Sequence, residues 1–207
     1  MVKIDRIYIS HCEKLTERLF YINKIIKTDF FKEKTEVFKF SELDDQNSLK
    51  NNGYVYNQLW PQGLKPTEIF IAEQMFSIYN KVVENKLQNV LILEDDFIIN
   101  DNFEKKINTI IENVPKDYDC VFMSSCGNLL VPDSCGDLFF ESDSSRCTCA
   151  YLVSLNFCEK VIKNKKYFSP IDWHLNFIKK DLNLKYYWTK DILFVQGSEN
   201  KYKSNIR

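Results

Sequence analysis

The hydrophobic and polar positions of the chain form two alternating patterns. Short apolar runs of strand length alternate with longer segments in which apolar residues recur every three or four positions, as on one face of a helix. The strand candidates in the first part of the chain are RIYIS at 6–10, TEVFKFSEL at 35–43, NVLILEDD at 89–96 and CVFMSS at 120–125. The helix candidates between them are residues 13–28, 66–86 and 102–114.

This alternation predicts an α/β fold around a largely parallel sheet, because helices usually connect parallel strands. The pattern changes after residue 126, where LFFES at 138–142 and CAYLVS at 149–154 lie close together without a helix between them, which predicts antiparallel additions. Helix candidates at 155–164 and 172–181 and the strand candidates LKYYW and ILFVQ complete the chain. Because no repeat or linker divides it, we expect a single domain, residues 1–207, with a central mixed, mostly parallel sheet flanked by helices.

Two local features concern the helix at 66–86. Residues 44–65 before it are polar and form a long loop candidate, and loops of about 20 residues are uncommon and often functional. We therefore expect this loop to cover a site. Pro66 and Thr67 then begin the helix, and Thr67 is the predicted N-cap.

The composition is that of a folded protein outside a membrane. A hydrophobic fraction of 44% with 16 Phe and 11 Tyr excludes a disordered chain, and no run of about 18 apolar residues is present to span a membrane. The first residues, MVKIDRIYIS, lack the apolar segment of a signal peptide. We expect a cytoplasmic protein. Its seven cysteines are odd in number and include no C-x-x-C pair, so we expect them to be reduced and to fill gaps in the core.

Charge is spread unevenly along the chain. The net charge of −1 excludes a general attraction to nucleic acid. Residues 158–207, however, carry 11 Lys and Arg against 5 Asp and Glu, while the preceding residues have an acidic excess. Solvated helix faces explain most of this basic excess; the alternative is contact with an anionic ligand, such as a diphosphate or the headgroups of a membrane surface.

Three consecutive carboxylates, Glu94, Asp95 and Asp96, follow the apolar run at 89–93. Ligands of open α/β sheets collect at the carboxyl ends of strands, where this cluster is expected to lie. Adjacent carboxylates repel one another unless a cation or hydrogen-bond donors compensate them, and carboxylate oxygens suit Mg²⁺ or Mn²⁺. The cluster therefore indicates a metal site with diphosphate; the alternative is three solvated acids at a turn, one of them capping the next segment.

The order of several motifs resembles a known family. IYISHCEKLTERL at the start, VLILEDDFII after a Glu-containing helix, then CAYLVS, PIDWHL and LFVQGS are similar to glycosyltransferase family 25, the lipopolysaccharide and collagen β-galactosyltransferase group. The resemblance covers nearly the whole chain. It implies a GT-A fold, a nucleotide-sugar-binding half at 1–125, an acceptor-side half at 126–207, a Mn²⁺ (or Mg²⁺) ion, and inverting transfer from a UDP-sugar.

The resemblance also implies roles for residues of the first half. Glu94, Asp95 and Asp96 match the DXD-type element: Asp96 is expected to reach the metal, and Glu94 or Asp95 to hold the ribose or a metal-bound water. Glu94 is also a candidate metal ligand. The opening segment places Ser10, His11 and Arg18 near the nucleotide, and Glu68 of the preceding helix joins this donor-binding set; Arg18 is equally well explained as a solvated helix charge.

Three residues of PIDWHL complete the candidate site. Inverting transfer needs a carboxylate that takes the proton from the attacking hydroxyl, and Asp172 is the candidate; the alternative is a simple N-cap. Trp173 offers an aromatic face to an acceptor sugar, although a large residue on an amphipathic helix is often core. His174 is a candidate third metal ligand, although a lone histidine is more often an ordinary hydrogen-bonded side chain. In QGSENKYKS, Gly197 permits close approach to a phosphate, with Lys201 and Lys203 beyond it.

One segment departs from the family's pattern. Where the family has roughly G-E-x-G-C-x-x-S-H, this chain reads TEIFIAEQMF, which keeps Glu68 and Ala72 and places Gln74 and Met75 at the Ser-His positions. The expected function is a metal-dependent hexosyltransferase of lipopolysaccharide or glycan biosynthesis, with galactose, glucose or N-acetylglucosamine as the sugar and a glycan or glycoprotein as acceptor. The alternatives are an inactive member that binds a glycan or protein, and a carboxylate-metal phosphohydrolase.

Overall fold

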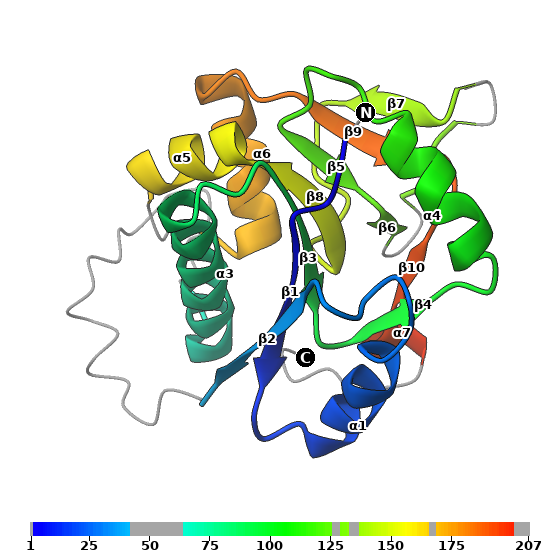
Figure 1. Ribbon diagram of the computed structural model, residues 1–207. Helices are drawn as coiled ribbons and strands as arrows, with labels where there is room; N and C mark the ends of the chain where they lie inside the picture. The colour runs from blue at the N-terminus through cyan, green and yellow to red at the C-terminus, as the bar shows by residue number, and fades with distance from the viewer. Residues whose placement is uncertain (1, 42–63, 126–128, 133–136, 166–168, 201–207) are drawn as a thin grey trace.

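The computed structural model describes residues 2–41, 64–125, 129–132, 137–165 and 169–200 (Figure 1). Its main sheet has seven strands in the order β2-β1-β3-β8-β5-β9-β7. Their bounds are β1 (Arg6–Cys12), β2 (Thr35–Phe40), β3 (Asn89–Glu94), β5 (Cys120–Phe122), β7 (Phe139–Ser142), β8 (Ala150–Ser154) and β9 (Tyr186–Thr189).

The sheet is mixed, as predicted. The pairs β1–β2, β1–β3 and β5–β9 are parallel, whereas β8 runs antiparallel to both β3 and β5, and β7 runs antiparallel to β9. All strands except β8 and β7 therefore point the same way. The strand of CVFMSS does not neighbour the carboxylate strand, because β8 lies between β3 and β5 and pairs with both.

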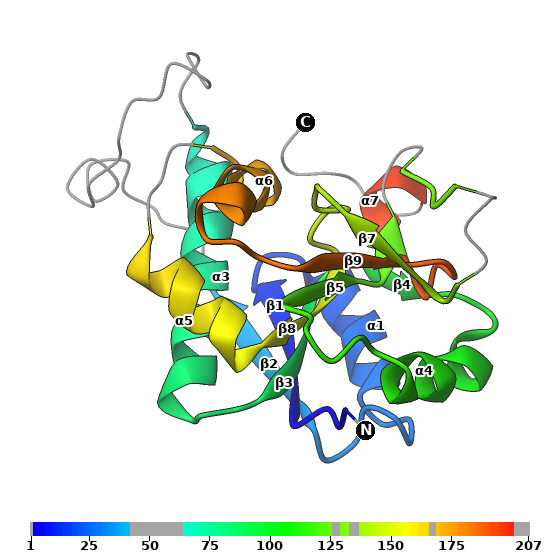
Figure 2. The same cartoon turned by 90° about the horizontal axis from the view of Figure 1, so that it is seen from above.

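Helices cover both faces of this sheet. Their bounds are α1 (Thr16–Ile25), α3 (Pro66–Glu84), α4 (Phe103–Glu112), α5 (Leu155–Lys163), α6 (Ile171–Asp181) and the short α7 (Gly197–Asn200). Figure 2 shows α3, α5 and α6 on one side of the sheet and α1 and α4 on the other. Each predicted helix is present, with ends within a few residues of the expected ones.

The strand β3 shows why an unbroken apolar run is needed. Val90 and Ile92 point into the core under α3, α5 and α6, while Leu91 and Leu93 point into the core under α1 and α4. All four are fully buried, because successive side chains of a strand face opposite sides of the sheet. Burial of each contributes about 1.5–3 kcal/mol. This holds the end of β3, and the carboxylates after it, in a fixed place.

A second, small sheet lies beside the carboxyl end of β3. It has the order β4-β10-β6, with β4 (Phe97–Ile99), β10 (Phe194–Gln196) and β6 (Ser124–Ser125). The antiparallel pairing of β10 with β4 places Gln196 opposite Phe97. The predicted strands CVFMSS and ILFVQ therefore contribute to this sheet, and the chain near residue 196 returns to the carboxylates.

The start of α3 differs from the expectation. Its N-cap is Lys65 rather than Thr67, and Glu68 accepts a hydrogen bond from the Lys65 backbone N–H at 2.8 Å through Oε2. This is the reciprocal half of a capping box, which supplies an acceptor to an N–H group at the helix start. The loop predicted at 44–65 lies almost entirely outside the described residues.

The expectation of seven reduced cysteines is wrong at Cys147, which forms a disulfide. Cys12, Cys120, Cys149 and Cys158 form no disulfide, and the last three are buried in the core, as expected for small apolar side chains. Because disulfides persist mainly in oxidising compartments, the expected cytoplasmic location stays a prediction.

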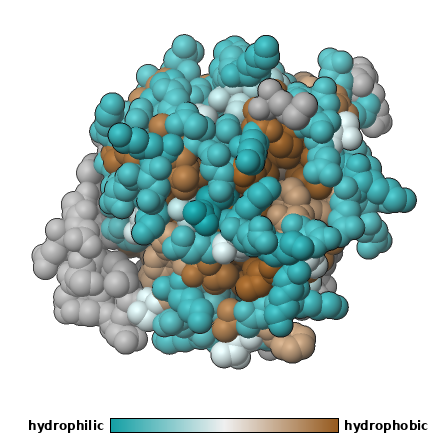
Figure 3. Space-filling model, viewed as in Figure 1, coloured by the Kyte–Doolittle hydropathy of each residue, from teal (hydrophilic) through white to brown (hydrophobic). Residues whose placement is uncertain are grey.

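Figure 3 shows that the surface on one face is largely hydrophilic, with apolar residues in small separate areas. None of the helices in the described part of the chain is both long enough and apolar enough to cross a membrane. The basic residues Lys201 and Lys203 lie outside the described residues, so contact of the C-terminal third with a membrane surface stays a prediction.

Candidate active site

The candidate site lies where β1 and β3 end side by side. These strands are parallel neighbours, and their register pairs Ser10 with Glu94. A cavity of about 110 Å³ opens at this edge. Its lining comes from β1 and the segment after it, from α1, α3 and the end of β3, and from the β10–α7 turn: Ser10, Cys12, Leu15, Arg18, Thr67, Phe70, Ile71, Gln74, Met75, Glu94, Asp95, Asp96, Gln196 and Ser198.

Asp95, the middle carboxylate, is bound by the protein itself. Its Oδ2 accepts hydrogen bonds from His11 Nδ1 at 3.0 Å and from the Cys12 backbone N–H at 2.9 Å. Its Oδ1 accepts one from Arg18 at 2.5 Å, and both side chains of this ion pair are buried. Asp95 therefore ties the end of β1 and the helix α1 to the end of β3. Arg18 is a partner of this carboxylate rather than a solvated helix charge.

Asp96 has a different environment. It is 4% exposed, and its Oδ2 accepts a hydrogen bond from the Ser198 backbone N–H at 3.2 Å. Its backbone carbonyl accepts one from Gly197 N–H at 2.6 Å, so the glycine that the sequence places near a phosphate lies next to Asp96. Among the described residues, Oδ1 of Asp96 has no hydrogen-bond partner, although it is buried. A buried carboxylate oxygen without a donor needs a ligand or water, because its desolvation is otherwise uncompensated.

Glu94 lies between these acids and β8. Its Oε1 accepts a hydrogen bond from the Thr148 hydroxyl at 2.5 Å. Burial raises the pKa of Glu94 to about 8, helped by the charges of Asp96, Asp172 and Asp95 and opposed by the Thr148 hydrogen bond. No sequence pattern points to Thr148, which becomes a neighbour of Glu94 only because β8 lies next to β3.

Gln74 and Met75, where the chain departs from the family pattern, both line the cavity. The Ser10 hydroxyl donates a hydrogen bond to Gln74 Oε1 at 2.5 Å, and both residues are buried. Met75 is fully buried, and its sulfur accepts a hydrogen bond from the Tyr151 hydroxyl at 3.3 Å. Neither residue is therefore an exposed replacement, and both are built into the wall of the site.

Asp172 and Trp173 lie at the start of α6. Asp172 is not the N-cap, which is Pro170; its Oδ1 accepts a hydrogen bond from the Trp173 backbone N–H at 2.9 Å. Burial raises the pKa of Asp172, with a further rise from the charge of Glu68 and an opposing effect of backbone N–H donors. Trp173 is 50% exposed and packs near Phe177, at 6.5 Å between ring centroids. Its exposure leaves an aromatic face open to a ligand.

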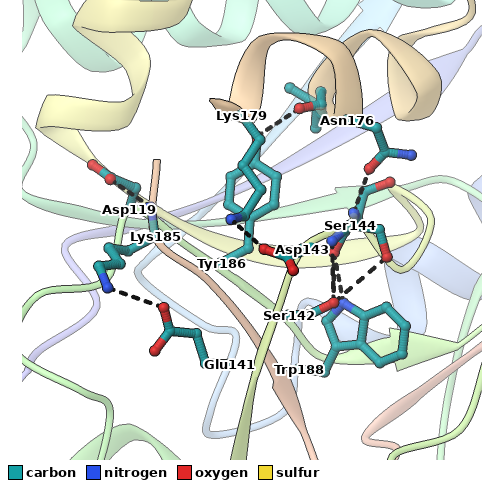
Figure 4. Close-up of polar contacts among 12 residues, drawn as sticks. Asp119, Glu141, Ser142, Asp143, Ser144, Asn176, Lys179, Lys185, Tyr186 and Trp188 are labelled. Carbon is teal, nitrogen blue, oxygen red and sulfur yellow. Dashed lines mark hydrogen bonds and ion pairs between the residues drawn. The ribbon is translucent and has the colours of Figure 1, made fainter. Parts of the chain in front are cut away.

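The helix α6 is held in place by the segment after β7, as Figure 4 shows. Lys179 of α6 pairs with Asp143 at 3.1 Å, and Trp188 of β9 donates a hydrogen bond to the Ser144 carbonyl at 2.8 Å. At the other end of this segment, the Ser145 hydroxyl donates to the Asp172 carbonyl at 3.0 Å. Asp172 is thus positioned by contacts with the sheet edge as well as by its own helix.

Three other predicted residues lie apart from the cavity lining. Glu68 caps α3, and its charge acts on Asp172. His11 is fully buried behind Asp95, and its Nε2 has no hydrogen-bond partner among the described residues. His174 is buried on α6 with its ring 5.8 Å from the Phe76 ring. Among the described residues, His174, Asp96 and Glu94 do not form a group that could hold a metal, so the expected metal shell of these three side chains is not formed.

The carboxylates of the site bear on whether it fits a divalent ion. Within the described ranges, no three His, Cys, Asp or Glu side chains form a group that could hold a metal. Mg²⁺-type ions at phosphate sites, however, commonly use only one or two protein carboxylates, with phosphate oxygens and waters as the other ligands. Asp96, with its buried unpartnered Oδ1, and the neighbouring Glu94 fit that smaller role.

The mixed sheet flanked by helices is a GT-A-like fold. The chain is similar to a glycosyltransferase involved in the glycosylation of the major capsid of PBCV-1, with 12% identity, a TM-score of 0.50 and coverage of 92% of each chain. It is also similar to the glycosyltransferase GlyE of Streptococcus pneumoniae TIGR4, with 10% identity and a TM-score of 0.50, over 98% of this chain and 58% of that one. At these identities the likeness shows the fold alone.

The family model that matches part of the chain is the one that the motifs resemble. Residues 75–175 match the family model of glycosyltransferase family 25, described as LPS biosynthesis protein. This segment begins at Met75 and contains the three carboxylates, β8, Asp172 and Trp173. No curated protein matches the sequence. The resemblance is therefore confirmed, and it supports a role in sugar transfer.

Proposed function

We propose that the protein is a metal-dependent inverting glycosyltransferase. It transfers a hexose, galactose in the first instance, from a UDP-sugar to a hydroxyl of a glycan or glycoprotein. The observation that carries this proposal is Asp96: a buried carboxylate with one unpartnered oxygen, at the carboxyl end of a central strand, inside the cavity. Such an oxygen is available to a cation that also binds a diphosphate.

The three carboxylates have different proposed roles. Asp95 fixes the turn, because its carboxylate oxygens accept hydrogen bonds from the protein's own donors at His11, Cys12 and Arg18. Asp96 and Glu94 hold the ion, which when bound supplies positive charge to the diphosphate that leaves the sugar. Because the ion would favour ionised Glu94, it would also oppose the effects that raise the pKa of that side chain.

Asp172 is the proposed base. The acceptor hydroxyl oxygen forms a bond to the anomeric carbon while the bond from that carbon to the diphosphate oxygen breaks, and Asp172 takes the hydroxyl proton. The products are the glycoside, with inverted configuration, and UDP. The charge of Asp172 contributes to the raised pKa of Glu94, which supports a role for Asp172 close to the carboxylates. Trp173, next to it and half-exposed, offers a face on which an acceptor sugar stacks.

The test is binding followed by turnover. UDP with Mn²⁺ should raise the melting temperature of the protein by mass action, and EDTA should remove the rise. Asp96→Ala should abolish it, whereas Asp101→Ala, an exposed acid beyond β4, should leave it unchanged. A panel of UDP-hexoses without acceptor should then show slow release of UDP from the preferred donor.

The outcomes separate the alternatives. If no divalent ion allows UDP to raise the melting temperature at millimolar concentration, the proposal is wrong. If UDP binds but no UDP-hexose is hydrolysed or transferred, the chain is a binding module. Release of phosphate from phosphate esters instead of UDP from UDP-sugars would indicate a phosphohydrolase.

A further inference from the structure

The amide of Gln74 is held in one orientation at the cavity wall. Gln74 is 4% exposed on α3, and its Oε1 accepts the hydrogen bond from the Ser10 hydroxyl at 2.5 Å. Within the described part of the chain, Nε2 of the same amide has no hydrogen-bond partner, although it is buried. One end of the amide is thus satisfied by the protein, and the other is not.

The orientation of the Gln74 amide agrees with the charges of the neighbouring side chains. The cavity that Gln74 lines is also lined by Glu94, Asp95 and Asp96. An N–H₂ group beside an acid-lined space is electrostatically favoured over a carbonyl oxygen in the same place. Ser10 reinforces this choice, because its hydroxyl donates to the oxygen. A buried N–H group without an acceptor is rare in folded proteins, and it indicates a place for a water or a ligand oxygen.

The other residues near this part of α3 restrict the chemical class of the ligand. Phe70, Ile71 and Met75 come from the same helix and line the same cavity, so this wall is largely apolar. An apolar wall with one amide donor suits a neutral ring that carries an oxygen acceptor, since a charged group would be poorly solvated there. Both the uracil carbonyl and a sugar hydroxyl have this chemistry.

We propose that Gln74 is a donor-binding residue: its Nε2 donates a hydrogen bond to a neutral oxygen of the sugar nucleotide, and Ser10 positions the amide. This inference rests on the proposed function, since it assigns a contact to the same UDP-sugar. Gln74 is also a position at which the chain departs from the family's pattern, so the contact belongs to this chain's own residues.

The experiment compares Gln74→Met with wild type by calorimetric titration of UDP and of UDP-galactose, each with Mn²⁺. Methionine keeps the approximate volume but removes the acceptor of the buried Ser10 hydroxyl, so the ligand-free melting temperature should fall slightly. The dissociation constant should increase about tenfold, as expected for one lost hydrogen bond to a buried ligand oxygen. Ser10→Ala should give a smaller increase. Gln88→Met, the same change at an exposed glutamine, should give none.

The two ligands distinguish the source of the oxygen. A loss seen with UDP and UDP-galactose alike places the acceptor on the nucleotide, and a loss seen only with UDP-galactose places it on the hexose. Gln74→Glu, at pH 8, keeps an oxygen for Ser10 and removes the N–H₂ group, so it should also weaken binding. This variant tests the contact of Nε2 with the ligand if Gln74→Met does not fold.

Wild-type affinity in the Gln74 variants would overturn the inference and leave the proposed function intact, because the amide would then contact only water. A lower ligand-free melting temperature with unchanged affinity would show a purely structural role. If wild type itself binds no UDP, the proposed function and this inference both fall.

Discussion

Replacing Asp95 by asparagine tests whether the middle carboxylate supports the fold rather than a ligand. Asp95 and Arg18 form an ion pair in which both side chains are almost fully buried, and the second Asp95 oxygen binds His11 and the Cys12 backbone. In Asp95→Asn the negative charge facing Arg18 is lost, and the new N–H₂ group points at a donor instead of accepting from it.

The burial of this ion pair sets the expected loss of stability in Asp95→Asn. Breaking a buried ion pair by removing one partner costs about 3–5 kcal/mol, and the lower end applies because asparagine keeps one acceptor oxygen. For a chain of this size each 1 kcal/mol lowers the melting temperature by about 2–4 °C, so a fall of roughly 6–12 °C is expected. The free energy of unfolding is measured by urea denaturation in EDTA, followed by far-UV circular dichroism.

The neighbouring variant Asp96→Asn is the matched control. Its asparagine oxygen retains the Ser198 N–H bond, and the oxygen that it loses has no partner among the described residues, so stability should be unchanged or higher. Binding of UDP with Mn²⁺ should nevertheless be lost. If Asp95→Asn unfolds at the wild-type urea concentration, or if Asp96→Asn is the less stable variant, the division of roles between the two carboxylates is wrong.

Two further predictions concern α6 and the buried arginine. Asp172→Asn should lower kcat by about 10²–10⁴ with unchanged UDP affinity, because only proton transfer is lost; Asp181→Asn, at the exposed end of the same helix, should have no effect. Arg146 is fully buried, donates to the Leu129 and Thr189 carbonyls at 2.6 and 2.8 Å, and lies over the Trp188 ring. Arg146→Lys should therefore cost about 2 kcal/mol in urea denaturation, since lysine cannot form both bonds and the stacking contact. Arg6→Lys, on a half-buried strand end, should cost little; equal losses in the two variants, or an active Asp172→Asn, would contradict these assignments.

The local spacing of apolar residues was sufficient to predict most helices and strands of the fold. The apolar run before Glu94 predicted a central strand covered on both faces, and Val90 to Leu93 are indeed divided between the two cores. Helical spacing predicted α1, α3, α4, α5 and α6, because one apolar face of each helix must pack against the sheet. The N-cap of α3 was placed wrongly, since the hydrogen bond from Lys65 to Glu68 depends on backbone geometry rather than on residue type.

The order of the strands in the sheet could not be predicted from the local spacing of apolar residues. Nothing in CAYLVS shows that β8 lies between β3 and β5, since pairing between distant strands depends on the whole sheet. That insertion brings Thr148 to Glu94. In the same way, only the folded chain shows that His11 and Arg18, which are 84 and 77 residues from Asp95, are its partners.

The sequence by itself determined the elements, the family resemblance and the position of three carboxylates at a strand end, because these depend on spacing of a few residues. The tertiary structure decided which carboxylate oxygen is satisfied and which is not. Asp95 meets donors from β1 and α1, Asp96 keeps one oxygen unpartnered among the described residues, and Gln74 meets Ser10 across the cavity. Hydrogen bonding of a buried polar atom depends on groups that are remote in sequence, so only the assembled fold distinguishes three adjacent acids from one another.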